Sequence, residues 1–172
     1  MSDPSLFSEL VSRKILTVEE NHLQILNKVD ISSYGSRAWA FSLQELGQKG
    51  GRKFLYELGY AMGTDAAEEI LEVVKQMQAY VTSKLRKLSN LIEITGFGIV
   101  DIKFSKDGSI KVIVRKNHII GFSKELYGKK SLACEFYRGV YSAFINVYKK
   151  TNIKLKKEAC ICKGDKNCIL TT

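Results

Sequence analysis

The chain has 172 residues, of which 45% are hydrophobic and 26% charged, and it carries a formal net charge of +9. This composition is typical of one folded domain and argues against a disordered or fibrous protein. No apolar run is long enough to span a bilayer. The start, "MSDPSLFSEL", does not resemble a signal peptide, so we expect a cytoplasmic protein.

The positive charge is spread along the chain rather than gathered in one segment. The densest basic clusters, "KLRK" at 84–87 and "KLKK" at 154–157, are short. Nucleic-acid-binding domains usually concentrate lysine and arginine on one face, whereas dispersed lysines suit a solvated surface. We therefore expect no specific nucleic-acid partner.

The first part of the chain predicts strands followed by helices. Apolar residues alternate on both sides of "EEN" within 14–29, which predicts two short strands. Residues 34–65 predict two helical stretches with a break near Gly50 and Gly51. Strands therefore come first and the helical part begins near residue 34.

The next segment predicts one long helix. Apolar residues recur at spacings of three and four through 66–90, and Asp65 with Glu68 resembles a capping box at its start. Gly59 and Gly63 lie one helical turn apart, a spacing that permits close approach of another element. We expect the apolar stripe to face the core or to form the seam of a homodimer.

The second half of the chain predicts a hairpin, a helix and a second hairpin. Alternating runs within 92–117 flank the dipeptide Asp107-Gly108, a strong turn signal. The segment "HIIGFSKELYGKK" that follows predicts a loop with a short turn of helix. A helix is expected over 131–150 with Ser131 as its N-cap, and the tail predicts strand, turn and strand.

This order of elements favours an α+β fold, an antiparallel sheet with helices packed on it. No linker, repeat or low-complexity tract divides the sequence. We therefore expect a single domain, with 1–34 as an N-terminal extension of strands and 35–172 as the core.

Cysteines are unevenly distributed, because three of the four lie within "EACICKGDKNC" at 158–168 and the fourth is Cys134. Four thiols at tetrahedral distance form the ligand set of a structural zinc ion. A disulfide, buried free thiols and an iron–sulfur cluster are the alternatives that the spacing leaves open. Zinc is the cofactor that we expect.

The spacing of the C-terminal cysteines suits a common face. If 158–162 is a strand, Glu158, Cys160 and Cys162 point to the same side because side chains alternate. A turn at Gly164-Asp165 then returns Cys168 toward Cys162, provided that the loop has an odd length or a bulge.

The segment from Cys134 to the C-terminus resembles the 4-vinyl reductase domain family. That family's closing pattern, C-x-x-x-G-D-x-x-C, is matched by Cys160, Gly164, Asp165 and Cys168. "FLYELGYAMG" at 54–63 resembles its helical Tyr…Gly…Gly stretch, and Gly139 follows Cys134 as in the family. The resemblance implies an α+β shell around an apolar pocket, together with a zinc site.

The resemblance also implies zinc ligands. In zinc-bearing members three cysteines and a glutamate hold the metal, and the cysteines correspond to Cys134, Cys160 and Cys168. The glutamate position is Lys157 here, which cannot bind zinc. Cys162 is the fourth ligand that we expect, with Glu158 as the alternative.

The implied pocket would accept a hydrophobic small molecule. His118 is a candidate polar group to orient it. The candidate lining residues, each of which also fits an ordinary core, are Trp39, Phe41, Phe97, Phe122, Tyr137 and Tyr141.

Three functions compete at this stage: a sensor or carrier module with a structural zinc, a dimeric scaffold without a ligand, and a tetrapyrrole-related reductase component. "GFG" at 96–98 lacks the third glycine of a nicotinamide-binding fingerprint, and a predicted strand follows it. We therefore favour a binding module over an enzyme. Its expected partners are a hydrophobic small molecule, a second copy of the chain and a signalling protein.

Overall fold

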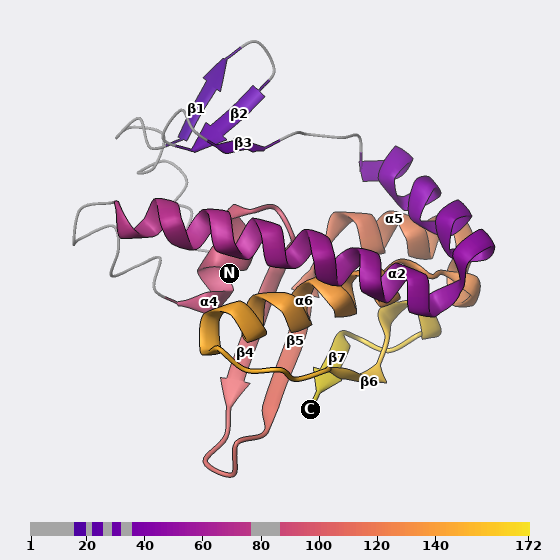
Figure 1. The fold of residues 1–172 in the computed structure, drawn as a ribbon. Helices are drawn as coiled ribbons and strands as arrows, with labels where there is room; N and C mark the ends of the chain where they lie inside the picture. Colours follow the sequence, from indigo (N-terminus) through magenta and orange to yellow (C-terminus); the bar gives the residue numbers. More distant parts are fainter. Residues whose placement is uncertain (1–15, 20–21, 26–28, 32–35, 77–86) are drawn as a thin grey trace.

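The computed structural model describes residues 16–19, 22–25, 29–31, 36–76 and 87–172 (Figure 1). It contains a three-stranded sheet, β1-β2-β3, and a four-stranded sheet in the order β4-β5-β7-β6. All strand pairs are antiparallel. Helices pack against the four-stranded sheet, so the predicted α+β class is confirmed.

The elements follow one another in this order: β1 Leu16–Glu19, β2 His22–Ile25, β3 Val29–Ile31, α2 Ser36–Lys75, α4 Leu88–Ile94, β4 Ile99–Phe104, β5 Ile110–Lys116, α5 His118–Tyr127, η1 Gly128–Lys130, α6 Ala133–Lys149, β6 Lys156–Ala159, η2 Ile161–Lys163 and β7 Cys168–Thr171. The two strands predicted within 14–29 are β1 and β2, and β3 pairs with β2 in addition.

Helix α2 has the predicted break. Gly51 has φ 80° and ψ 174°, a left-handed backbone that favours glycine. A second predicted boundary, the capping box at Asp65, is wrong because the helix continues without interruption to Lys75. The helix predicted to reach residue 90 is also corrected: α4 is a separate helix that begins at Leu88, and 77–86 lie outside the described residues.

The central hairpin is confirmed, with a longer turn than a two-residue loop. Phe104 pairs with Ile110, and the Asp107 carboxylate accepts a hydrogen bond from the Ser109 N–H inside the turn. The segment predicted as a loop with a short turn of helix is instead a helix of ten residues, α5, from His118 to Tyr127. The Asn117 side chain accepts a hydrogen bond from the Ile120 N–H and thereby caps α5.

The start of α6 also differs from the prediction. The helix begins at Ala133 with Leu132 at the N-cap position and no side-chain cap. The hydroxyl of Ser131, the expected cap, lies 2.7 Å from that of Ser123 on α5 instead. Gln44 on α2 fixes this entry, because its side-chain oxygen accepts a hydrogen bond from the Leu132 N–H.

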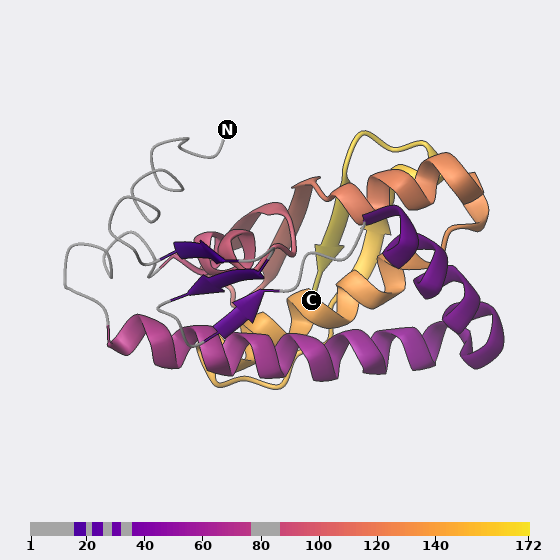
Figure 2. The same ribbon diagram turned by 90° about the horizontal axis from the view of Figure 1, so that it is seen from above.

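Helix α6 is the centre of the molecule. Its residues from Ala133 to Asn146 are buried except Arg138, as expected of a helix with protein on every side. Figures 1 and 2 show α6 between α2 and the four-stranded sheet. Gly59 lies against Phe136 and Gly63 against Val140, so α2 and α6 run in the same direction.

The register of the four-stranded sheet turns one face toward α6. Val112 pairs with Leu170 and Val114 with Cys168, and all four side chains are buried. Because side chains alternate along a strand, this register places Cys168 on the inner face of the sheet.

Alanine at Gly59 tests the contact between α2 and α6. An added Cβ would lie 2.0 Å from the carbonyl oxygen of Phe136, which is backbone and cannot yield. We expect Gly59→Ala to lower the free energy of unfolding by about 3 kcal/mol, as overpacking does. Urea denaturation followed by circular dichroism measures the change.

Gly121→Ala is the matched control, because a Cβ at this helical glycine meets no atom within 4 Å. We expect it to raise stability by about 0.5 kcal/mol through helix propensity. Equal effects of the two substitutions would show that close helix approach does not limit packing at Gly59.

Candidate metal centre

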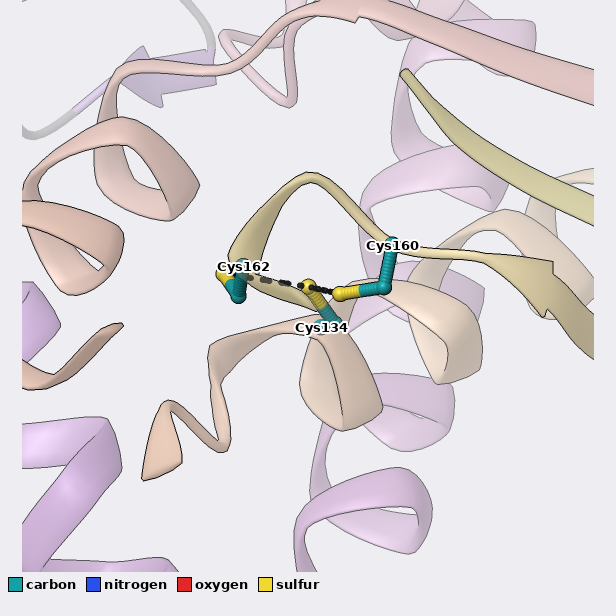
Figure 3. Close-up of side chains that lie close together, drawn as sticks. All are labelled: Cys134, Cys160 and Cys162. Carbon is teal, nitrogen blue, oxygen red and sulfur yellow. Dashed lines mark hydrogen bonds between the residues drawn. The ribbon is translucent and has the colours of Figure 1, made fainter. Parts of the chain in front are cut away.

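The four cysteines come from separate elements and meet in the core (Figure 3 shows three of them). Cys134 lies in the first turn of α6, Cys160 directly after β6, Cys162 in η2 and Cys168 at the start of β7. Each is at most 4% exposed, and all are free thiols.

The sulfur of Cys134 is the centre of the cluster. It lies 3.1 Å from that of Cys160 and 3.8 Å from those of Cys162 and Cys168. Tetrahedral zinc with Zn–S bonds of about 2.3 Å places its sulfurs about 3.8 Å apart. A buried cluster of three or four cysteines is therefore compatible with a metal site, and Cys134, Cys160 and Cys162 all lie within 4.8 Å of one another.

A tight turn, not a strand face, brings Cys160 and Cys162 together. The prediction of a strand through 162 is wrong, because β6 ends at Ala159 and Cys162 lies in the 3-10 helix η2. Gly164 ends this turn with φ 109°, and the Asp165 carboxylate accepts a hydrogen bond from the Cys160 N–H at 2.8 Å. The glycine and aspartate of the closing pattern thus shape the loop that presents the thiols.

Cys168 reaches the cluster through the sheet register. Cys168 pairs with Val114 of β5, and the pairing of β6 with β7 shifts between Lys157 and Ala159. The Ile161 N–H donates a hydrogen bond to the Cys168 sulfur at 3.3 Å. Backbone donors of this kind stabilise thiolate sulfur.

The protonation of the cluster is strongly coupled. Hydrogen bonds with Cys160, Cys162 and Cys168 raise the pKa of the Cys134 thiol far above its ordinary value. The hydrogen bond from Cys134, followed by those of the other two thiols, lowers the pKa of Cys160. One thiolate is thus favoured at the expense of its neighbours, and a cation is needed before all four can ionise together.

Glu158, the alternative fourth ligand, lies on the outer face of the sheet. Its side chain is 53% exposed, its carboxylate accepts a hydrogen bond from the Thr171 hydroxyl at 2.9 Å, and Lys111 lies 4.0 Å away. The Cys162 sulfur, by contrast, lies 3.8 Å from that of Cys134 and within 4.8 Å of that of Cys160.

Beside the cluster lies a buried ion network that the sequence analysis did not identify. Lys157 pairs with Glu135 at 2.5 Å, and Arg138 pairs with the same carboxylate at 3.0 Å. Burial alone would raise the pKa of Glu135, but hydrogen bonding and charge from Lys157 and Arg138 hold it below its ordinary value. The sequence carried one signal for this network. Lys157 and Glu158 are neighbours on a strand, so their side chains point to opposite faces and one of the two charges must face the protein.

The structure divides the predicted ligand-binding residues between the core and the surface. Phe97, Tyr137 and Tyr141 belong to one aromatic cluster, with ring centroids of Phe97 and Tyr137 6.4 Å apart and those of Tyr137 and Tyr141 6.0 Å apart. The Tyr141 hydroxyl donates a hydrogen bond to the Phe97 carbonyl at 2.9 Å. Trp39 is connected to this cluster through Phe136. The ring centroids of Trp39 and Phe136 lie 5.9 Å apart in an edge-to-face arrangement, and Phe136 packs on Tyr137.

The remaining candidates lie elsewhere. Phe41 is 55% exposed. His118 and Phe122 line an open cavity of about 260 Å³ at the start of α5, which also borders Cys168. Of the seven residues predicted to bind a ligand, His118 and Phe122 line this open cavity, whereas Trp39, Phe97, Tyr137 and Tyr141 belong to the aromatic cluster.

Solved structures share this fold. The phenol-responsive sensory domain of the transcription activator PoxR, in complex with phenol, has a TM-score of 0.70 at 13% identity, and the match covers 99% of this chain and 90% of that one. A trafficking protein particle complex subunit 3 from Naegleria fowleri, covalently bound to palmitic acid, has a TM-score of 0.55 at 15% identity over 79% and 92% of the two chains.

A third structure is an H-NOX protein from S. oneidensis in the Fe(II)NO state, with a TM-score of 0.53 at 13% identity over 97% of this chain and 87% of that one. No family model and no curated protein sequence matches this chain. The fold resembles those of small-molecule sensory domains. At these identities the likeness concerns the fold, and function depends on the site.

Substitution of Glu135 tests the buried network. Glu135→Gln would leave Lys157 and Arg138 partly buried without their anion, so we expect it to lower the free energy of unfolding by about 3 kcal/mol. Urea denaturation of the metal-free protein measures this loss.

The control is Glu158→Gln, an exposed carboxylate on the neighbouring strand, with an expected change of less than about 0.5 kcal/mol. If Glu158→Gln lowered the free energy of unfolding as much as Glu135→Gln does, burial of the Glu135 ion pairs would not explain their contribution to stability.

Proposed function

We propose that this protein is a binding module for a hydrophobic small molecule, a sensor or carrier, and that a structural zinc ion fastens its C-terminal hairpin to α6. The observation that carries the proposal is the cluster of four buried thiols within a fold like that of a phenol-responsive sensory domain. A zinc ion with four protein ligands has no open position, so its role is to hold elements together.

The zinc part of the proposal rests on ligand chemistry. Cys134, Cys160, Cys162 and Cys168 offer four soft donors, and the shared sulfur of Cys134 lies at tetrahedral spacing from two of the others. Zinc would ionise all four thiols and so remove their competition for protons. The adjoining strands β6 and β7 have only four residues each, so a metal link would add stability that so small a hairpin lacks.

The ligand part rests on the aromatic interior. Two proteins of similar fold were solved with an organic molecule bound: the PoxR sensory domain with phenol, and the trafficking protein particle complex subunit 3 with covalently bound palmitic acid. In this chain Trp39, Phe97, Tyr137 and Tyr141 supply apolar surface, and the Tyr141 hydroxyl and Asn117 amide supply polar groups beside it. We propose that a ligand enters by displacing the partly buried rings of Trp39 and Phe97 rather than by filling an existing void.

One observation favours the alternative of a dimeric scaffold without a ligand. Tyr137 is 1% and Tyr141 0% exposed, so these rings already fill the core. Phe54 and Met62 are 41% and 38% exposed on α2, an apolar surface that suits a second copy of the chain. A homodimer is compatible with both functions, and a signalling partner is expected only for the sensor.

No helix among the described residues is long and apolar enough to cross a bilayer.

Metal content tests the zinc site. We expect native mass spectrometry and elemental analysis of untagged protein to find one zinc per chain. Cys162→Ser should lower zinc affinity at least about tenfold, because it removes a ligand, and Glu158→Gln should leave it unchanged. A mass lower by two or four hydrogens, without metal, would mean that the cysteines form disulfides. A loss of zinc affinity in Glu158→Gln would identify Glu158, rather than Cys162, as the fourth ligand.

The same native spectra test the ligand. We expect an additional mass of a few hundred daltons that dissociates on denaturation, and a tenfold or greater loss of its occupancy in Trp39→Ala, because a ring that contacts the ligand contributes about 1.5–3 kcal/mol. Phe41→Ala, which truncates an exposed aromatic residue on the same helix, is the control. Purified dimer with no additional mass under any growth condition would favour the scaffold.

A further inference from the structure

An open cavity of about 260 Å³ lies where β5 ends and α5 begins. Segments far apart in the sequence line it: the end of β5, the first two turns of α5, and the C-terminal cysteine region. Its apolar lining consists of Val114, Ile120, Phe122 and Ile161. The volume is slightly below the range of about 300–1,000 Å³ typical of drug-sized ligands, so the cavity suits a smaller molecule.

Three basic residues and one acidic residue line this cavity. Lys116 and His118 line it, and neither has an ion-pair partner within the part of the chain that the structure describes. Arg115 also contributes, although its guanidinium is paired with Asp101. Glu125 is the acidic residue of the lining. The chain's net charge of +9 adds a long-range field that attracts anions.

From this combination we infer a second binding site, for a small carboxylate with an apolar body. The apolar body packs on Ile120 and Phe122, and the carboxylate lies against Lys116 and His118. A charge-assisted hydrogen bond from a lysine is roughly twice as strong as a neutral one, so the anionic group determines the preference for ligands.

This site adjoins the aromatic interior at Asn117 but has a different lining. Tyr137 and Tyr141 do not line the cavity, whereas Cys168 does. A bound carboxylate would therefore contact the edge of the cysteine cluster and not the core between α2 and α6. The inference does not rest on the proposed interior ligand, and the two are tested by different substitutions.

Gly121 offers a way to close the cavity without disturbing the fold. It lines the cavity from within α5, and a Cβ at this position meets no atom within 4 Å. Leucine has a better helix propensity than glycine. Gly121→Leu should therefore fold and place its side chain in the space that the ligand would occupy.

The experiment titrates the 172-residue chain, as purified, with phenylacetate and with phenylacetamide, its uncharged isostere, and follows amide chemical shifts by NMR. We expect phenylacetate to bind at least tenfold more tightly than phenylacetamide and to shift resonances at the start of α5. Equal affinities for the two probes, or stronger binding of the cation phenethylamine, would overturn the inference.

Three variants locate the site. Gly121→Leu should abolish binding of phenylacetate, and Lys116→Gln should reduce its affinity about tenfold toward that of phenylacetamide. Lys106→Gln removes the same charge from the turn between β4 and β5 and should have less than a twofold effect. Unchanged binding in Gly121→Leu, or equal losses in the two lysine variants, would show that the anion binds elsewhere or through net charge alone. If Gly121→Leu unfolds, the comparison of the lysine variants still decides the outcome.

Discussion

The close contact between α2 and α6 is the constraint on which the rest of the structure depends. Gly59 and Gly139 bring the two backbones so near that a Cβ at either position would overlap a carbonyl oxygen, at 2.0 and 2.1 Å. Dispersion forces along such a contact are individually small and collectively large. With α2 on one side and the sheet on the other, α6 is fixed in position, and its first turn presents Cys134 to the C-terminal loop.

The cysteine cluster then joins parts of the chain that other contacts hold only weakly. Strands β6 and β7 are short, and the loop between them is shaped by Gly164 and Asp165. Around it, the ion network of Lys157, Glu135 and Arg138 connects β6 to α6. A buried charge without a partner would lower the stability of the fold. Glu135 on α6 is tolerated because Lys157 reaches it from β6 and Arg138 from α6 itself.

The two proposed binding sites for a small molecule differ in how much space they offer. The aromatic interior between α2, α6 and the Phe97 loop is filled in this structure, so an occupant must displace side chains and its binding must offset their packing. The cavity at the start of α5 is open, and two of its basic residues, Lys116 and His118, have no ion-pair partner within the described part of the chain. On this proposal the aromatic interior would favour an apolar ligand and the cavity an anionic one.

The sequence by itself determined the fold class, the break at Gly51, the central hairpin and the group of cysteines, because periodicity, glycine and turn signals are local. It did not determine the run of α2 through Asp65 or the helix α5, because tertiary packing overrides a weak capping signal and Asn117 acts through a single hydrogen bond. Strand alternation also gave the wrong reason for the meeting of Cys160 and Cys162, which lie on a 3-10 turn. Only the tertiary structure decided that Lys157 pairs with Glu135 and that the Cys162 sulfur lies near those of Cys134 and Cys160. The first depends on which side of β6 meets α6, and the second on the 3-10 turn that follows β6.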